Sequence, residues 1–231
     1  MWQLDFQNQF GLQPSQIKAL ERYLKMLVST RGRGLTAVTE PVAIVDVHFR
    51  DSLSLLEIPE TASATRAVDI GSGAGLPGLP LAIARPQLQI LMLESVRRKY
   101  EFIRHAIDSI GLKNASAMNL RAEEAGQTDL RQSFDLAFAR AVGSLPEVLE
   151  YSLPLLKTGG FALLQRGAYT RNDVERASKA AEFLGGTLSR IGAVKPYPAA
   201  RNLSVWIFHK HATTPRQYPR RPGVPRKRPL S

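Results

Sequence analysis

Residues 68–78 read Val-Asp-Ile-Gly-Ser-Gly-Ala-Gly-Leu-Pro-Gly, and this stretch decides the fold. The apolar run that ends at Ile70 predicts a buried strand, and the glycines after it predict a tight loop that leads into a helix. Because glycine has no side chain, the backbone of such a loop can approach a ligand closely. In α/β sheets, ligands bind beyond the carboxyl ends of the strands. The stretch therefore predicts a nucleotide-type binding site after the first strand.

Outward from this stretch, short apolar runs alternate with segments of helical periodicity, which is typical of repeated β-α units on a parallel sheet. The predicted strands are Ala67 to Ile70, Gln89 to Leu93, Ala115 to Met118, Phe134 to Ala139, Phe161 to Leu164, Leu188 to Val194 and Leu203 to His209. The predicted helices are Pro77 to Ala84, Val96 to Ile110, Leu145 to Leu156 and Asn172 to Leu184. Residues 61–211 are thus expected to form an α/β domain with an open, doubly wound, seven-stranded sheet.

Residues 1–60 predict a helical cap. Apolar residues recur at helical spacing after Pro14-Ser15, and Arg31-Gly32-Arg33-Gly34 is expected to end that helix. A second helical segment is predicted from Pro41, since proline suits the first helical turn, through His48 toward Leu56. The apolar positions of the first helix are Ile17, Leu20, Leu24, Leu27 and Val28.

The formal charge of +11 predicts a polyanionic partner, and nucleic acid is the leading candidate. Residues 212–231 form a basic tail that contains no acid, and its five prolines are expected to prevent a regular helix. The alternative interpretation of this tail is a solvating segment that aids solubility. Its basic residues, the candidates for RNA contact, are Arg216, Arg220, Arg221, Arg226, Lys227 and Arg228.

The residue types that are absent or rare exclude several kinds of site. No cysteine occurs, so disulfides, thiolate metal sites and cysteine nucleophiles are excluded. The four histidines lack the spacing of a helical zinc site, so no metal is expected. No run of about 18 apolar residues and no basic, then apolar, leader is found, and we expect a cytoplasmic location.

Asp69 distinguishes between two kinds of ligand for the glycine loop. Residues 73–78 also satisfy the dinucleotide pattern G-x-G-x-x-G. A carboxylate directly before the loop would repel a pyrophosphate, but it suits a ligand that carries an ammonium and a sulfonium. S-adenosylmethionine has both cations and no phosphate. Glu94, at the end of the second strand, can accept hydrogen bonds from ribose hydroxyls in either class of cofactor.

Several blocks of the chain resemble one known family. Residues 68–82, Val-Asp-Ile-Gly-Ser-Gly-Ala-Gly-Leu-Pro-Gly-Leu-Pro-Leu-Ala, are similar to the cofactor motif of the glucose-inhibited division protein B family, the 16S ribosomal RNA N7-guanine methyltransferases. The chain departs from the family at Gly34, where asparagine is usual, and at Gln165-Arg166-Gly167, where Lys-Gly is usual. The other similar blocks are Leu35-Thr36-Ala37, His48 with Asp51-Ser52-Leu53, Arg121-Ala122-Glu123-Glu124, Ala139-Arg140-Ala141, and the tail from Tyr218-Pro219-Arg220 to Pro229-Leu230.

The resemblance implies a class I, Rossmann-like, S-adenosylmethionine-dependent methyltransferase that acts on rRNA of the small ribosomal subunit, and we expect a monomer. Together with the positions of Asp69, Glu94 and the loop glycines, the resemblance implies a set of cofactor-binding residues. Arg140 follows the fourth strand and is also the candidate catalytic residue. We expect its partner, a cofactor carboxylate or a guanine oxygen, to be absent from the free protein. The predicted cofactor contacts are Asp69, Gly71, Gly73, Gly75, Leu76, Glu94, Ser95, Val96, Ala122, Glu123 and Arg140.

The residues also constrain the methyl acceptor. Guanine N7 already has a lone pair, so no general base is needed to create the nucleophile. Methylation at carbon-5 of cytosine through a cysteine nucleophile is excluded. The segment Ala139-Arg140-Ala141 does not resemble the Asp/Asn-Pro-Pro-Tyr loop of adenine amino-methyltransferases. A methyltransferase for another RNA, a small molecule or a protein, a nicotinamide-dependent reductase, and an RNA-binding assembly factor without activity stay open as alternatives.

Overall fold

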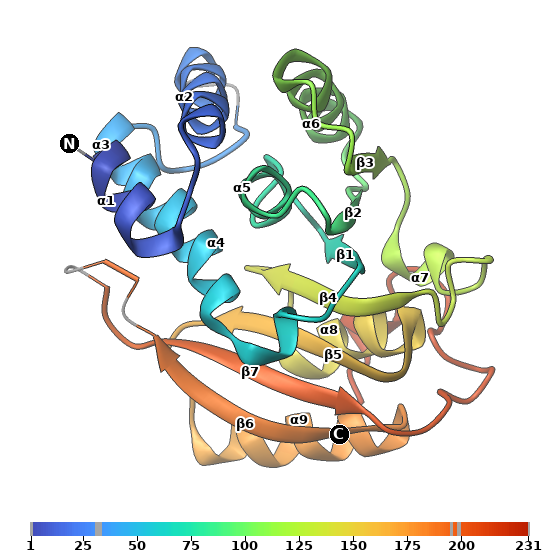
Figure 1. The fold of residues 1–231 in the computed structure, drawn as a ribbon. Helices are drawn as coiled ribbons and strands as arrows, with labels where there is room; N and C mark the ends of the chain where they lie inside the picture. The colour runs from blue at the N-terminus through green and yellow to red at the C-terminus, as the bar shows by residue number, and fades with distance from the viewer. Residues whose placement is uncertain (1, 31–33, 195, 198–199, 231) are drawn as a thin grey trace.

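Strand β1 (Arg66–Ile70) lies in the interior of the sheet, between β2 and β4, and ends directly at the glycine loop. The computed structural model describes residues 2–30, 34–194, 196–197 and 200–230, and within them seven strands form one sheet in the order β3-β2-β1-β4-β5-β7-β6 (Figure 1). The predicted seven-stranded sheet is therefore confirmed. The other strands are β2 (Gln89–Leu93), β3 (Ala115–Met118), β4 (Phe134–Arg140), β5 (Leu156–Arg166), β6 (Gly186–Val194) and β7 (Leu203–Lys210).

The sheet is mixed, whereas repeated β-α units are typical of a parallel sheet, and the difference lies at one strand. Strands β1 to β5 pair in parallel, whereas β7 runs antiparallel to both of its neighbours, β5 and β6. Eight residues separate Val194 from Leu203 in the sequence, and only antiparallel neighbours can be joined by so short a connection.

Helices cover both faces of the sheet. Helices α5 (Gly78–Ala84) and α6 (Arg97–Ile110) lie on the face that the N-terminal helices also cover, and α8 (Leu145–Ser152) and α9 (Arg171–Phe183) lie on the opposite face (Figure 1). The four predicted helices are confirmed. The predicted helix from Leu145 to Leu156 ends earlier, at Ser152, and a 3₁₀ turn (Leu153–Leu155) that contains Pro154 follows it.

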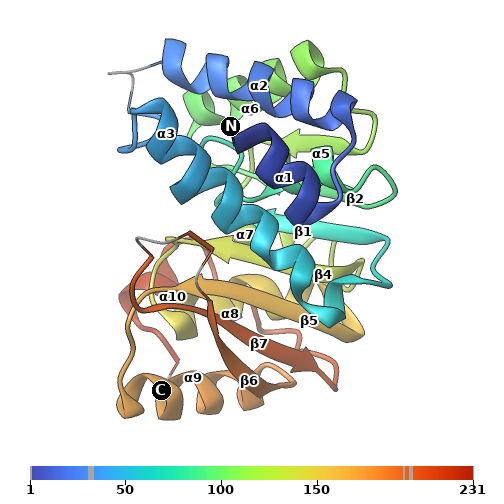
Figure 2. The ribbon, with the colours of Figure 1, turned by 60° about the vertical axis from the view of Figure 1, so that its left-hand side comes forward.

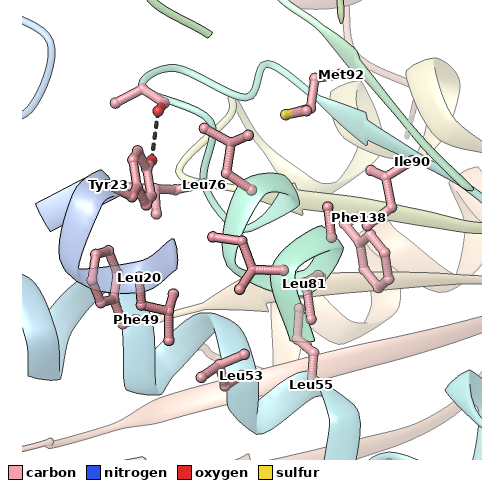
Figure 3. Packing of buried hydrophobic residues seen from close by; sticks show 14 of the residues in the cluster. Leu20, Tyr23, Phe49, Leu53, Leu55, Leu76, Leu81, Ile90, Met92 and Phe138 are labelled. Carbon is pink, nitrogen blue, oxygen red and sulfur yellow. Dashed lines mark hydrogen bonds between the residues drawn. The ribbon is translucent and has the colours of Figure 1, made fainter. Parts of the chain in front are cut away.

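Alternating side chains of each strand face two separate clusters of buried residues. In β4, Phe138 packs into the cluster beneath the N-terminal helices, while Ala137 and Ala139 pack into the cluster beneath α8 and α9. Figure 3 shows the first cluster, where side chains of the cap meet those of the sheet and of α5. The cap therefore shares its core with one face of the sheet.

The cap contains both predicted helical segments and one that was not predicted. Helix α2 (Pro14–Ser29) buries Ile17, Leu20 and Leu27, as expected; of the residues expected to end it, 31–33 lie outside the described residues. The second segment is irregular: α3 (Pro41–Ala43), the π-helix η1 (Ile44–Arg50), α4 (Asp51–Leu53) and the 3₁₀ helix η2 (Ser54–Glu57) follow one another. Helix α1 (Trp2–Phe10), not predicted, packs beside them (Figure 2).

The basic tail is folded against the rest of the protein. The Arg131 guanidinium donates hydrogen bonds to the carbonyls of Thr214, Pro215 and Tyr218. The expectation of no regular helix in the tail is wrong for one turn, α10 (Val224–Lys227). Its Pro225 lies in the first turn, where the missing N–H has no intrahelical partner to lose.

The described residues contain no helix that is both long and apolar enough to cross a membrane. Within that same part of the chain, no group of three or more histidine, aspartate or glutamate side chains is placed to hold a metal ion.

Candidate functional site

The glycine loop turns sharply after β1 and is held against the end of β2. Gly71 and Gly73 have φ of 66° and 60°, in the left-handed region that favours glycine. The amide of Gly71 donates to the carbonyl of Leu93 at 2.9 Å. A Cβ on Gly71 would lie 2.7 Å from the Cγ2 of Val142, so this position admits no larger residue without a shift of its neighbour.

A tyrosine of the cap supports the same loop from below. The Tyr23 hydroxyl, on α2, donates a 2.6 Å hydrogen bond to the carbonyl of Ala74, and the ring stacks on Phe49 at a centroid distance of 5.3 Å (Figure 3). Tyr23 is fully buried. Sequence reasoning missed this residue, because its spacing within α2 indicates only a core position.

Asp69 braces the loop and does not line the cavity beside it. Its side chain is fully buried, and its Oδ2 accepts a 2.9 Å hydrogen bond from the amide of Gly78. Burial raises the pKa of Asp69 to about 7. Its Oδ2 thus contacts the first turn of α5, whereas its Oδ1 is buried without a hydrogen-bond partner among the described residues, and the attraction of Asp69 to a cofactor cation stays a prediction.

Glu94 and its neighbours form the second part of the loop's support. The two carboxylate oxygens of Glu94 accept hydrogen bonds from the amides of Gly73, at 2.8 Å, and Val96, at 2.7 Å. The side chain is 5% exposed. Glu94 thus ties the glycine loop to the end of β2, and its contact with a ribose stays a prediction.

A cavity of about 310 Å³ opens beside the loop, and we call it the glycine-loop cavity. Four of the predicted cofactor residues line it, Gly71, Ser95, Ala122 and Glu123. Six other predicted residues do not line this cavity, namely Asp69, Gly73, Gly75, Leu76, Glu94 and Val96. Its volume falls within the range of about 300–1,000 Å³ that ligand pockets occupy.

The C-terminal tail supplies one wall of this cavity. The amide of Gly223 donates to Glu123 Oε1 at 2.9 Å, and Gly223 and Arg226 both line the cavity. Glu123 is 4% exposed and lies in α7 (Ala122–Ala125). The sequence placed the tail apart from the cofactor site, because a contact across 100 residues leaves no local signal.

Arg140, at the end of β4, has partners within the free protein. Its Nη1 donates to Asp51 Oδ2 at 2.9 Å and to the carbonyl of Val47 at 3.0 Å, and its Nη2 lies 3.2 Å from His48 Nδ1. The expectation that its partner is absent from the free protein is therefore wrong. A half-buried guanidinium is costly to leave unpaired, and the cap supplies the carboxylate that balances it.

The partners of Arg140 form a buried polar network. His48 Nε2 lies 2.7 Å from Thr36 Oγ1, so both ring nitrogens have neighbours. Burial, with Arg140 beside it, lowers the pKa of His48 to about 4. The imidazole is therefore neutral at physiological pH, and the network carries one positive and one negative charge.

A second cavity, of about 370 Å³, lies at the ends of β4 and β5, and we call it the Arg140 cavity. The cap lines it with Val47, His48 and Asp51, and β5 contributes Gln165. Residues 140–141 line the Arg140 cavity and residues 142–143 line the glycine-loop cavity, so one short segment separates the two.

The six basic tail residues differ in their surroundings. Five of them are exposed, whereas Arg220 is partly buried and paired with Glu150. The shortest hydrogen bond between the two side chains runs from Arg220 Nη2 to Glu150 Oε2 at 2.6 Å, and Glu150 is fully buried. Arg220 is therefore a structural anchor of the tail and not a free RNA contact. The exposed residues are Arg216, Arg221, Arg226, Lys227 and Arg228.

Solved structures with the same fold include a SAM-dependent O-methyltransferase from Thermotoga maritima. It matches with a TM-score of 0.54 over 82% of this chain and 72% of that one, at 16% identity. This likeness shows the Rossmann-like methyltransferase fold.

The sequence comparisons reach further than the fold. Two proteins named Ribosomal RNA small subunit methyltransferase G are similar over nearly their whole length. The one from Carboxydothermus hydrogenoformans is 38% identical over 97% of this chain and 97% of its own. The one from Moorella thermoacetica is 39% identical over 95% and 92%. A family profile described as "rRNA small subunit methyltransferase G" matches residues 16–203. The chain therefore belongs to the rRNA small subunit methyltransferase G family.

Proposed function

We propose that this protein transfers a methyl group from S-adenosylmethionine to N7 of a single guanine in the 530 loop of 16S rRNA. Membership of the family supports the small ribosomal subunit as substrate. The observation that carries the proposal is the pair of adjoining cavities, because a methyl donor and a methyl acceptor must meet across one boundary.

The glycine-loop cavity fits an adenosine with a cationic side chain. Gly71 lines the cavity with bare backbone, and acidic Glu123 and Glu147 line it as well. Gly71, Ser95, Ala122 and Glu123 would hold the nucleoside, with the loop fixed behind it by Glu94. When bound, S-adenosylmethionine supplies the methyl group of its sulfonium. The sulfur is left as a neutral thioether once that methyl group has been transferred.

The protein's own part in the reaction is alignment and exclusion of water. Guanine N7 provides its own lone pair, so the chain needs no base at the reacting atom. Holding the two reactants in line can supply much of the rate acceleration. Arg140 lines the Arg140 cavity, two residues before the part of the same segment that lines the glycine-loop cavity. Its described contacts use three of its five N–H donors. The remaining donors can orient a guanine O6 or a cofactor carboxylate.

The exposed basic residues of the tail would contact the phosphates of the rRNA around the target. This electrostatic contact would be sequence-independent and weakened by salt. We place the protein in the cytoplasm, where it would act as a monomer on the small ribosomal subunit and without a metal.

Incubation with isotope-labelled S-adenosylmethionine and small subunits that lack the modification, followed by nucleoside analysis, tests the proposal. We expect 7-methylguanosine from one site in 16S rRNA. A different methylated nucleoside as the sole product would overturn the guanine assignment. Methylation of free small molecules without RNA would favour another acceptor, and rRNA binding without methyl incorporation would indicate an assembly factor.

A further inference from the structure

We propose that the Arg140 cavity receives the target guanine base, and that Gln165 and Asp51 recognise the Watson–Crick edge of that base. This inference rests on the proposed function, because it assigns the acceptor site of the same reaction. The cavity lies at the ends of β4 and β5, beside the glycine-loop cavity and separated from it by residues 140–143. A base in the one cavity would therefore adjoin a donor in the other.

Gln165 carries the argument, because it holds an acceptor without a partner. Its side chain, on β5, is 6% exposed and lines the cavity. The amide Nε2 donates to the carbonyl of Asp51 at 2.9 Å, which fixes which end of the amide is nitrogen. The Oε1 is buried and has no hydrogen-bond partner among the described residues. A buried acceptor without a donor is unfavourable, so a ligand that brings an N–H would bind here preferentially.

Asp51 adds a second acceptor on the same wall. Its Oδ2 accepts from Arg140, and a carboxylate can accept up to about four hydrogen bonds. The Asp51 carboxylate therefore keeps lone pairs for a further donor.

Guanine is the base that matches two acceptors. Its Watson–Crick edge presents the N1–H and the 2-amino group, both of which donate, whereas adenine presents an acceptor at N1. An acceptor opposite adenine N1 would place two lone pairs against each other. With the Watson–Crick edge held by Gln165 and Asp51, N7 on the opposite edge stays free to react. The O6 can accept from Arg140.

The other walls suit the faces of a base. Val47, Val194 and Leu203 give the cavity apolar surfaces, and Tyr197 adds an aromatic ring. Bases that leave an RNA structure are commonly stacked on aromatic side chains. Tyr197 lines the same cavity as Asp51 and Gln165, so its ring lies close to the polar wall.

The test uses Gln165→Met, which keeps the approximate size of the side chain and removes both the oxygen and the nitrogen of the amide. Gln89→Met is the matched control, because Gln89 is exposed at the start of β2, at the opposite end of the strands. Small-subunit RNA is prepared with guanosine, inosine or adenosine at the target position. Affinity for each RNA is measured with S-adenosylhomocysteine present, so that no turnover occurs. Cofactor affinity is measured by calorimetry.

We expect wild type to bind the guanosine RNA more tightly than the adenosine RNA. In Gln165→Met the ratio of these two affinities should be about tenfold smaller, which is the effect of one specific hydrogen bond. The affinity of Gln165→Met for S-adenosylmethionine and the behaviour of Gln89→Met should match wild type. If Gln165→Met does not fold, equal wild-type affinity for the three RNAs overturns the inference without any variant.

Other results separate this inference from the proposed function. If wild type forms no 7-methylguanosine, the proposed function fails. If wild type does form it, but Gln165→Met keeps its full preference for guanosine, only the present inference fails. If Gln165→Met loses cofactor affinity and keeps that preference, the Arg140 cavity belongs to the cofactor.

Discussion

Tyr23 of the cap and Ala74 of the glycine loop are joined by a fully buried hydrogen bond of 2.6 Å. The cap thus reaches the cofactor side of the protein as well as the Arg140 cavity. Its helix α2 supports the loop, while Val47, His48 and Asp51 line the cavity proposed for the base.

Tyr23→Phe tests this support. The carbonyl of Ala74 would lose its buried donor, which typically costs about 1–3 kcal/mol. We expect a lower melting temperature and weaker binding of S-adenosylmethionine, measured by calorimetry. Tyr100→Phe on α6, where the side chain is partly exposed, is the control and should change neither value. Equal cofactor affinity for Tyr23→Phe and wild type would show that the loop keeps its shape without the cap.

Gly71→Arg should abolish cofactor binding. The new side chain would enter the glycine-loop cavity, and its Cβ would lie 2.7 Å from Val142. The left-handed backbone at φ 66° also costs a non-glycine residue about 1–2 kcal/mol, so the melting temperature should fall moderately. Calorimetry on the folded variant checks the first effect, and retained affinity would remove Gly71 from the cofactor site.

Arg140→Ala should lower both stability and methylation. The change leaves the Asp51 carboxylate buried without its guanidinium, and breaking such a pair typically costs about 3–5 kcal/mol. Denaturant unfolding should show this loss, and the double variant Arg140→Ala with Asp51→Asn should recover part of it. If the double variant regains stability but not methylation, Arg140 acts in the reaction as well. An unchanged unfolding midpoint in the single variant would contradict the paired geometry.

Arg220→Ala and Arg221→Ala should separate the two roles of the tail. The first removes the partner of the fully buried Glu150, so we expect a large loss of stability and weaker cofactor binding. The second removes an exposed charge, so we expect weaker RNA binding and a salt slope smaller by roughly 0.7–0.9 for each phosphate that the variant no longer neutralises. If instead Arg220→Ala weakened RNA binding and lowered the salt slope, while Arg221→Ala lowered stability, Arg220 would be the residue that contacts the RNA. Binding titrations at several salt concentrations make the comparison.

Lys210 should make stability depend on pH in the alkaline range. The buried ammonium donates to the carbonyl of Leu184 at 2.8 Å and to the hydroxyl of Thr214, and burial lowers its pKa from 10.5 to about 7. Between these values the unfolded chain binds more protons than the folded protein, so the free energy of unfolding should rise with pH from about 7 to 10.5. Lys210→Met should remove this rise. Parallel pH profiles for both proteins would show that Lys210 keeps its ordinary pKa.

The sequence predicted the architecture well, because strand and helix periodicities and the glycine loop are local signals. Gly71, Ser95, Ala122 and Glu123 were placed at one site and line one cavity. The pairing of Arg140 with Asp51 and the anchoring of Arg220 on Glu150 were not predicted. Both pairs join residues that are far apart in the chain, and an arginine in a sequence gives no indication of which carboxylate will neutralise it.

Gly223 and Arg226 form one wall of the glycine-loop cavity, and the order of synthesis decides when this wall can form. These residues follow β7, so every strand has been translated before the ribosome reaches them. A chain that stops before Gly223 could complete its sheet and would still lack a donor to Glu123. Translation errors late in the message would thus yield a protein with an intact sheet and an unfinished binding site.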